Sequence, residues 1–219
     1  MAKVDVGKKI LSENDRVAAK NRETFDDAGV LVLNFISSPG SGKTTLLETT
    51  LDRLPQDLRV LVIEGDVSTT RDLDRVKAHG ATGVQINTGG GCHLSAKMVA
   101  EVLPELDVEH ADIIFIENVG NLICPSTYDL GEDGKVVLLA TTEGDDKPMK
   151  YPTIFYESRL AILNKIDLLP YLDYDVEKVQ REVEVLNADC ELLQVSARSG
   201  EGIDDWISWI TTRLEEKRS

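Results

Sequence analysis

Residues 37–45 read SSPGSGKTT and lie between an apolar run at 30–36 and a helix-compatible segment that starts at Leu46. A strand, a glycine-bearing loop and Lys-Thr at the start of a helix together form a phosphate-binding loop. The backbone N–H groups of such a loop and the helix N-terminus favour a triphosphate. The sequence therefore predicts that a nucleoside triphosphate binds here. The residues expected to hold it are Gly40, Ser41, Gly42, Lys43, Thr44 and Thr45.

Two side chains of this loop have specific roles in the prediction. Lys43 is expected to reach the β- and γ-phosphates, and the hydroxyl of Thr44 is expected to bind Mg²⁺. The usual pattern begins with glycine, and here that position is Ser37. Because the core of the motif is intact, we interpret the serine as a tolerated variant. A Gly/Ser surface turn is the alternative, and the strand before and helix after the loop disfavour it.

The composition is that of a globular protein, with 219 residues, 42% hydrophobic and 29% charged. The net charge of −15 argues against nucleic acid or an anionic membrane surface as the main partner. No apolar run reaches the roughly 18 residues that a membrane span needs, and the first thirty residues contain no apolar signal core. Three cysteines do not make a disulfide framework, so a reducing cytoplasm is expected.

Short apolar runs alternate with helical patterns along the chain, which predicts an α/β fold with a mostly parallel sheet and helices on both faces. With the phosphate-binding loop, this is the P-loop NTPase fold. We expect one nucleotide-hydrolysing domain over residues 1–219, in which 1–28 form an amphipathic helix and 29–219 the nucleotide-binding domain proper. The helix packs on its own domain or on a dimer partner. The predicted strands are 30–36, 59–63, 84–86, 112–116, 136–140, 159–163 and 191–195.

The base is predicted by Asn164-Lys165-Ile166-Asp167, which follows a predicted strand and has the N-K-x-D form of guanine-recognition loops. The Asp167 carboxylate can accept two hydrogen bonds from guanine, and adenine cannot donate the same pair. Lys165 is expected to lie along the base, and Asn164 to brace the loop. Ser196-Ala197 resembles the element whose backbone N–H contacts the guanine oxygen. The predicted nucleotide is therefore GTP rather than ATP.

Glu117 and Gly120 occupy the place of a D-x-x-G element, in which a carboxylate supports Mg²⁺ and a glycine N–H meets the γ-phosphate. Glutamate instead of aspartate is a departure, so Asp66 is the alternative source of the carboxylate. A helix N-cap is the other interpretation of Asp66. No glutamine is evident to position an attacking water, and we expect slow intrinsic hydrolysis. The predicted catalytic residues are Lys43, Thr44, Asp66, Glu117 and Gly120, and those at Mg²⁺ are Thr44, Asp66 and Glu117.

Cys92, His93 and Cys124 lie in polar, glycine- or proline-bearing loops, and their donor types suit Ni²⁺ or Zn²⁺. Burial as small hydrophobic residues is the alternative for cysteines, and we assign Cys190 to it. A closed tetrahedral site needs a fourth donor, which is water or a cysteine from a second copy of the chain. Because Cys124 follows Gly120 closely, we expect the nucleotide state and metal affinity to be coupled.

The motifs together resemble the nickel-insertion GTPases of hydrogenase maturation, the HypB family, in the SIMIBI class of P-loop GTPases. The resemblance covers about residues 30–215. It implies a GTP-dependent homodimer that delivers nickel to the [NiFe]-hydrogenase large subunit, together with a small zinc- and nickel-binding partner. It also implies that the Cys-His pair and Cys124 bind the metal. The stretches that carry it are SSPGSGKTT, IEGD (63–66), GGGCHL (89–94), ENVGNLICP (117–125), EGDDKPMKYP (143–152) and NKIDLLP (164–170).

Some features depart from this family or admit other interpretations. Many relatives carry an N-terminal cysteine- or histidine-rich nickel motif, and residues 1–29 contain neither residue type, so a storage site is not expected. Lys147, Lys150 and Tyr151 are expected to face the dimer or the nucleotide, or to form a solvated loop. A urease-type nickel GTPase usually has Cys-Pro-His in place of the adjacent Cys-His pair. A regulatory GTPase without metal and a metabolic kinase are the remaining alternatives.

Overall fold

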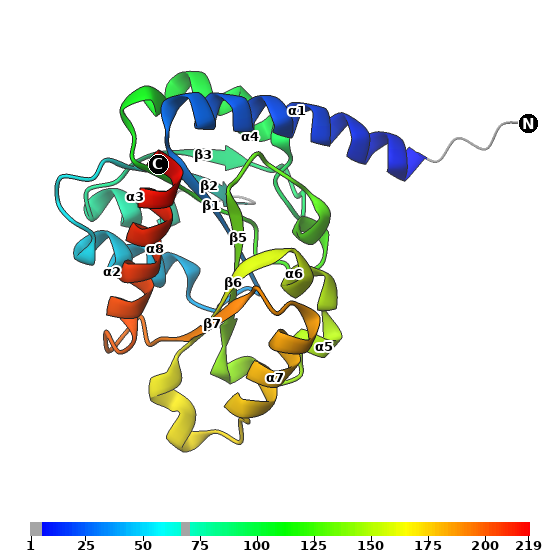
Figure 1. The fold of residues 1–219 in the computed structure, drawn as a ribbon, viewed down its shortest axis with the longest axis vertical. Helices are drawn as coiled ribbons and strands as arrows, with labels where there is room; N and C mark the ends of the chain where they lie inside the picture. Colours follow the sequence, from blue (N-terminus) through cyan, green and yellow to red (C-terminus); the bar gives the residue numbers. More distant parts are fainter. Residues whose placement is uncertain (1–5, 67–70) are drawn as a thin grey trace, which may run out of the picture.

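The computed structural model describes the backbone of residues 6–66 and 71–219, and their side chains except at 6–9, 66 and 71. Its centre is a parallel sheet in the order β3-β2-β4-β1-β5-β6-β7 (Figure 1). The strands are β1 (Leu31–Ser37), β2 (Val60–Asp66), β3 (Thr82–Asn87), β4 (Ile113–Glu117), β5 (Gly134–Ala140), β6 (Ser158–Asn164) and β7 (Glu191–Gln194). The predicted α/β class, the parallel sheet and each predicted strand are confirmed, with strand ends that shift by up to three residues.

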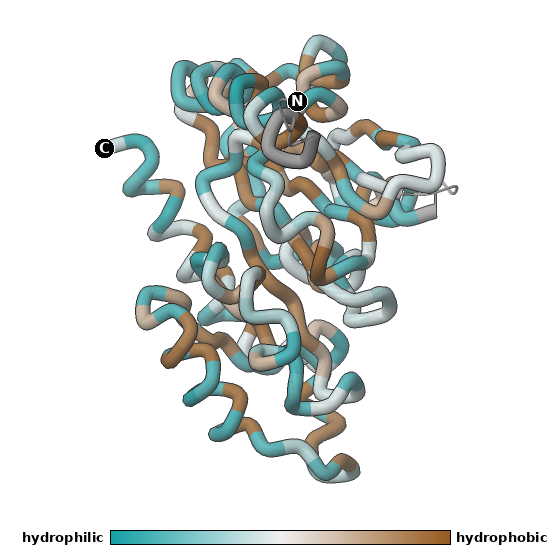
Figure 2. The backbone as a smooth tube through the Cα atoms, turned by 90° about the vertical axis from the view of Figure 1, so that its right-hand side faces the viewer, coloured by the Kyte–Doolittle hydropathy of each residue, from teal (hydrophilic) through white to brown (hydrophobic). Residues whose placement is uncertain are grey.

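The central strands are apolar on both faces because helices cover both. In β1, Leu33 and Phe35 face one hydrophobic core, whereas Val32 faces another. All three side chains are almost completely buried. This two-sided burial is typical of a parallel sheet and explains the continuous apolar runs in the sequence. Figure 2 shows the hydrophobic segments concentrated in the central strands and the hydrophilic ones on the outer helices.

Helices cover the two faces in separate groups (Figure 1). On one face α2, α3 and α8 pack around a core that includes Trp206. On the other face α1 and α4 pack over β1, β2 and β4, while α6 and α7 pack over β5 and β6. The α-helices are α1 (Val6–Ala28), α2 (Lys43–Arg53), α3 (Arg71–Ala78), α4 (Ala96–Val102), α5 (Lys147–Lys150), α6 (Pro152–Glu157), α7 (Val176–Leu186) and α8 (Ile203–Arg218). The 3₁₀ helices are η1 (Leu103–Glu105), η2 (Val108–His110), η3 (Cys124–Thr127), η4 (Thr141–Glu143) and η5 (Ile166–Tyr171).

The predicted N-terminal helix is present as α1, and its C-terminal half packs on α4. Phe25 is buried in the core below it, and Asn21 donates hydrogen bonds to the carbonyls of Ala96 and Leu130. The N-terminal end of the helix extends away from the body of the molecule (Figure 1). Only part of this helix is therefore packed against the rest of its own chain.

Because every strand pair is parallel, all strands end at the same edge of the sheet. The loops that follow β1, β3, β4, β6 and β7 meet there, and together with the end of β2 they carry the predicted site residues. Ligands of open α/β sheets bind at this edge. Within the described residues, no helix combines the length and apolarity needed to cross a membrane.

Candidate nucleotide and metal site

The phosphate-binding loop has a backbone that requires glycine at one position. Gly42 lies at φ 98°, and α2 begins at the next residue, Lys43. A Cβ atom at Gly42 would come within 2.6 Å of Nδ2 of Asn164. Conformation and space therefore both exclude a side chain here. The loop and the predicted guanine-recognition loop are in direct contact at this point.

Ser37, the departure from the usual glycine, is buried and lies at the centre of a small hydrogen-bond network. The Lys43 ammonium donates to Oγ of Ser37 at 2.9 Å, and the hydroxyl of Ser41 donates to the same atom at 2.6 Å. The Ser37 hydroxyl in turn donates to the carbonyl of Ser38 at 2.7 Å. The serine thus holds the Lys43 ammonium in place, which the sequence motif does not reveal.

Asn164 braces the two loops, as predicted from the sequence. Its amide donates to the carbonyl of Ser41 at 2.9 Å. Its carbonyl oxygen accepts the backbone N–H groups of Lys165 at 2.8 Å and of Ala197 at 3.0 Å. One buried side chain therefore connects the phosphate-binding loop, the N-K-x-D loop and the Ser-Ala element.

Lys165 and Asp167 complete this part of the site. Lys165 adopts the left-handed region at φ 64°, and its ammonium donates to the carbonyl of Gly40 at 2.7 Å. This contact lays the lysine stem across the phosphate-binding loop. The sequence instead predicts that the stem lies along the base. Oδ1 of Asp167 accepts the Ser196 hydroxyl at 2.6 Å. The carboxylate is therefore oriented by the neighbouring Ser-Ala element.

A pair of buried carboxyl groups lies beside the start of α2. Glu64 of β2 and Glu117 of β4 are direct neighbours in the sheet register, and each is 3% exposed. The Thr44 hydroxyl donates to Oε1 of Glu117 at 2.9 Å. Burial and the Glu117 carboxylate raise the pKa of Glu64 to about 10, and burial raises the pKa of Glu117. Such a pair holds a proton at neutral pH.

The same pair fits a divalent cation. Oε2 of Glu64 and Oε2 of Glu117 are buried without a hydrogen-bond partner, and two carboxylate oxygens beside a threonine hydroxyl are the hard donors that Mg²⁺ prefers. Sequence reasoning selected Glu117 and Asp66 and missed Glu64. The backbone of Asp66 ends β2, whereas its side chain lies outside the described residues.

Gly120 lies against the phosphate-binding loop, on the segment that follows β4. A Cβ atom at Gly120 would be 3.0 Å from Cγ and 3.1 Å from Cα of Pro39. The backbone of this segment therefore packs tightly on the loop. Both segments line a cavity of about 660 Å³. Its other lining residues include Glu64, Gly65, Asp72, Arg75, Asn118 and Lys165.

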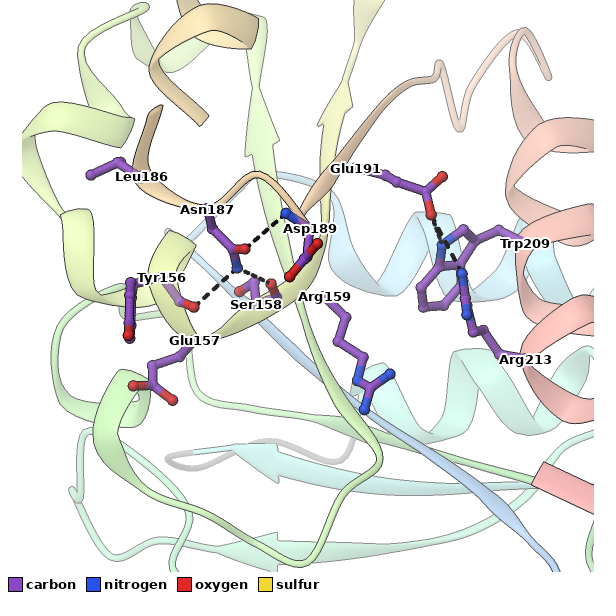
Figure 3. Close-up of a pocket in the computed structure, with 10 residues that line it drawn as sticks. All are labelled: Tyr156, Glu157, Ser158, Arg159, Leu186, Asn187, Asp189, Glu191, Trp209 and Arg213. Carbon is purple, nitrogen blue, oxygen red and sulfur yellow. Dashed lines mark hydrogen bonds and ion pairs between the residues drawn. The ribbon is translucent and has the colours of Figure 1, made fainter. Parts of the chain in front are cut away.

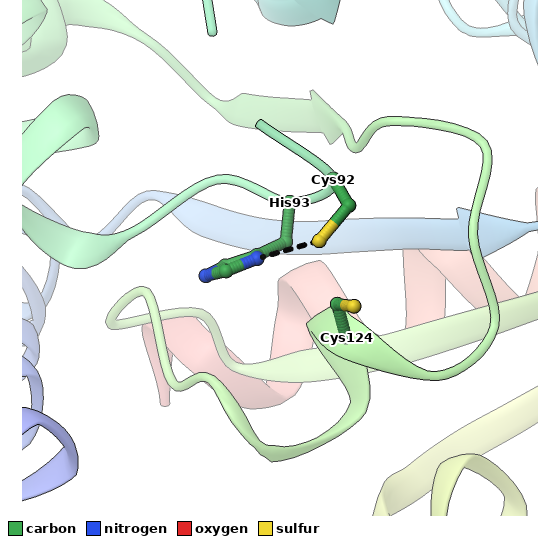
Figure 4. Close-up of side chains that lie close together, drawn as sticks. All are labelled: Cys92, His93 and Cys124. Carbon is green, nitrogen blue, oxygen red and sulfur yellow. Dashed lines mark hydrogen bonds between the residues drawn. The ribbon is translucent and has the colours of Figure 1, made fainter. Parts of the chain in front are cut away.

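The three predicted metal ligands come together at the same edge of the sheet. The ligand atoms of Cys92, His93 and Cys124 all lie within 4.8 Å of one another. Figure 4 shows that Cys92 and His93 come from one loop, and Cys124 from the start of another segment, η3. Sγ of Cys92 is 3.5 Å from Nδ1 of His93. Two thiols and an imidazole in this arrangement form three corners of a Zn²⁺ or Ni²⁺ site.

The surroundings of this cluster affect its protonation. Burial lowers the pKa of His93, which favours the neutral imidazole that binds metal. A hydrogen bond with the Cys124 thiol raises the pKa of Cys92, so metal must displace a proton there. The ring of Tyr128 lies 3.9 Å from that of His93, centroid to centroid, a contact that the sequence does not predict. Cys190 is buried, and it is not part of the cluster.

Lys147, Lys150 and Tyr151 lie on α5 and at the start of α6. The two ammonium groups are 5.9 Å and 5.8 Å from the centroid of the Tyr151 ring. Neither the lysines nor the tyrosine lines the nucleotide cavity.

Another hollow of about 740 Å³ lies at the amino ends of β6 and β7, away from the loops described above (Figure 3). Arg159 and Arg213 share it with three carboxylates, and Trp209 donates to Glu191 at 3.3 Å. It contains none of the predicted site residues. Its mixed charge and its position on the opposite edge separate it from the nucleotide and metal chemistry.

Comparison with known proteins identifies the family of this chain. The family model described as CobW/HypB/UreG, nucleotide-binding domain, matches residues 31–194. The hydrogenase maturation factor HypB of Escherichia coli (strain K12) is 50% identical over 204 residues, which are 93% of this chain and 70% of that protein. The chain belongs to the HypB family. The family resemblance inferred from the motifs is thereby confirmed.

Two HypB structures have the same fold. The crystal structure of HypB from Helicobacter pylori in complex with nickel aligns with a TM-score of 0.88 at 38% identity, over 94% of this chain and 97% of that one. HypB from Archaeoglobus fulgidus aligns with a TM-score of 0.87 at 37% identity, over 93% and 100%. These values confirm the P-loop α/β fold and place the chain among hydrogenase maturation factors.

Proposed function

We propose that this protein is a GTP-hydrolysing metallochaperone that binds nickel or zinc and delivers nickel during [NiFe]-hydrogenase maturation. One observation carries the proposal. The segment from Glu117 to Cys124 lines the phosphate cavity at one end and supplies a metal ligand at the other. A nucleotide at Gly120 and a metal ion at Cys124 are thus only four residues apart.

GTP selection follows from the contacts of the N-K-x-D loop. Asp167 presents its carboxylate to the N1–H and amine of guanine, and the backbone N–H of Ala197 turns from Asn164 to the guanine oxygen when the base binds. Adenine would leave Asp167 unpaired, which disfavours ATP. The contact of Asn164 with Ser41 keeps the base end and the phosphate end of the site in fixed register.

Hydrolysis depends on electrostatic stabilisation more than on a base. Lys43 leaves Ser37 for the β- and γ-phosphates, and the Gly120 N–H meets the γ-phosphate. Thr44, Glu117 and Glu64, with Asp66 as a further candidate, would hold Mg²⁺, and the proton shared by the two glutamates would be released to solvent when the ion binds. Mg²⁺ held by these residues would supply positive charge against the charge that develops on the phosphates. No residue in this set activates water, which supports a slow intrinsic rate.

The metal at Cys92, His93 and Cys124 is cargo. With three donors per chain, a fourth comes from water or from a second copy, and the second case joins metal binding to a GTP-dependent homodimer. We expect the cargo to pass to or from a small zinc- and nickel-binding partner, and finally to the hydrogenase large subunit in the cytoplasm. The adjacent Cys-His pair separates this reading from a urease-type GTPase.

Nickel titration of the pure protein tests the proposal. It is done with GDP and with non-hydrolysable GTP, while oligomer size is followed in the same samples. Cys92→Ala and Cys124→Ala should abolish tight binding, whereas Cys190→Ala, a thiol outside the cluster, should leave it unchanged. Half a metal per chain in a dimer would support a shared site. Equal nickel affinity of the Cys92→Ala variant and the original protein would refute the metal assignment.

A further inference from the structure

Asn118 follows Glu117 directly, and its side chain is almost completely buried at 2% exposure. It is among the residues that line the nucleotide cavity. Its carbonyl oxygen accepts the backbone N–H of Val119 at 3.0 Å and, across the chain, that of Leu94 at 3.1 Å. Leu94 is the residue after His93. Asn118 therefore touches both the segment that senses phosphate and the loop that carries two metal ligands.

The orientation of the Asn118 amide is fixed from behind. Its Nδ2 donates to Oδ1 of Asn34 at 3.2 Å, and Nδ2 of Asn34 donates to Oε1 of Glu132 at 3.1 Å. All three side chains are buried. The Glu132 carboxyl oxygen accepts at the end of this series of hydrogen bonds. Both amides must therefore direct their NH₂ groups towards it, so the oxygen of Asn118 faces Leu94.

Leu94 transmits a displacement because it has no free space around it. Its side chain is fully buried, and a Cβ atom at Gly65 of β2 would lie 2.8 Å from it. A movement of the Asn118 amide therefore shifts or releases the Leu94 N–H rather than being absorbed by loose packing. The atoms that move with it belong to His93, one residue away.

We infer that Asn118 is a positioning residue that couples the nucleotide state to the geometry of the Cys92–His93 pair. The inference rests on the proposed function, since it requires that nucleotide and metal are both bound. When the γ-phosphate engages Gly120, the segment from Glu117 shifts, and Asn118 carries the shift to Leu94. Asn121, which donates to the carbonyl of Cys92 at 3.2 Å, differs because it joins two parts of the metal site itself.

The test compares nickel dissociation constants in GDP and in non-hydrolysable GTP for the original protein, Asn118→Ala and Asn14→Ala. Asn14 is the matched control. It is also a buried asparagine, and its carbonyl oxygen accepts the N–H of Ala96 at 2.9 Å, two residues beyond Leu94, but it lies on α1. Coupling between sites is typically about 5–150-fold. We expect this ratio to persist in Asn14→Ala and to fall below about twofold in Asn118→Ala.

A ratio in Asn118→Ala equal to that of the original protein would overturn the inference and leave the proposed function intact. A ratio of one in the original protein would instead remove the coupling from the proposed function, and the inference with it. Hydrogen exchange of the Leu94 amide in the unmodified protein gives a second readout that does not depend on the folding of a variant. Its protection should differ between the two nucleotides, and identical protection would contradict the role of Asn118.

Discussion

At the scale of single residues, the carboxyl pair of Glu64 and Glu117 has the largest consequence. An unfolded glutamate loses its proton near 4.5, whereas burial keeps the proton on folded Glu64 up to about pH 10. Between these values the folded state binds more protons than the unfolded state. The free energy of unfolding therefore falls as pH rises through this range, because the unfolded state is favoured by proton release. Under the proposed function Mg²⁺ binding also releases this proton, so we expect Mg²⁺ affinity to rise with pH.

Glu64→Gln should reduce the pH dependence of the free energy of unfolding in the nucleotide-free protein. It should also reduce the pH dependence of Mg²⁺ binding in the complex with GTP. We expect the urea midpoint to vary less between about pH 6 and about pH 9 than in the original protein, and Mg²⁺·GTP to bind more weakly. Glu191→Gln is the control, because this glutamate lies at the opposite edge of the sheet, outside the nucleotide cavity. Loss of Mg²⁺·GTP affinity in the control as well would argue against a specific role for Glu64.

A comparison of Gly42 with Gly40 separates the effect of backbone conformation from the effect of the space available to a side chain. Both adopt positive φ, at 98° and 78°, but only at Gly42 would a Cβ atom meet Asn164. Gly40→Ala should weaken GDP binding by the strain of about 1–2 kcal/mol that a left-handed residue carries. Gly42→Ala should weaken it further, because the clash also displaces the N-K-x-D loop. Calorimetric titration with GDP measures the difference, and equal losses would rule out the contact as its cause.

Some of these residues could be predicted from the sequence and others could not. The phosphate-binding loop, Asn164 and Cys92 stand in contiguous motifs whose chemistry is visible in the order of the residues. Glu64 was missed because its role depends on the register of β2 against β4, which places it beside Glu117. Asn118 likewise acquires its role from a contact with a loop 24 positions earlier in the chain.

At the scale of elements, α8 is attached to the phosphate-binding helix α2 through Trp206. The indole of Trp206 is fully buried, and its N–H donates to Oγ1 of Thr50 at 2.8 Å. The ring also packs edge to face on Phe35 of β1, with centroids 5.9 Å apart. The C-terminal helix thus supports both elements that flank the phosphate-binding loop. This hydrogen bond depends on how the two helices pack, so it cannot be predicted from the sequence of either helix.

Trp206→Phe should lower the free energy of unfolding by about 1–3 kcal/mol, because it removes the buried hydrogen bond and part of the ring volume. Urea unfolding followed by the fluorescence of the remaining Trp209 measures the change. Trp209→Phe is the matched control on the same helix. Its indole donates to Glu191 at a longer 3.3 Å, so we expect a smaller loss. A larger loss in the control would contradict the importance of the contact with Thr50.

At the scale of the whole molecule, the strand order determines where the two sites meet. β2 lies between β3 and β4, so the loops after β3 and β4 converge above the end of β2. Cys92 and His93 are on the first loop and Cys124 follows the second. The alternation of strands and helices predicts a parallel sheet, but it does not reveal this order. The proximity of metal and phosphate therefore emerges only with the fold.

Ligand binding should be visible in the stability of the whole chain. At a hundredfold excess over its dissociation constant, GDP with Mg²⁺ stabilises the folded state by about 2.7 kcal/mol. For a chain of this length that corresponds to a rise in Tm of about 5–11 °C. Differential scanning fluorimetry should show this shift with GDP and GTP but not with ATP. Asp167→Ala should remove the preference, and an equal shift with ATP in the original protein would contradict the guanine assignment.

The placement of the metal ligands has a consequence for how such a protein can change. Cys92, His93 and Cys124 are all at least partly exposed, and their loops contribute few side chains to the hydrophobic cores, chiefly Leu94 and Leu122. Under the proposed function, a change of sequence in two short loops could therefore change which ion is bound, while the phosphate-binding loop and the sheet beneath stay as they are. A molecule built in this way separates the nucleotide-binding part, which sets when the metal is released, from the loops that determine which metal is bound.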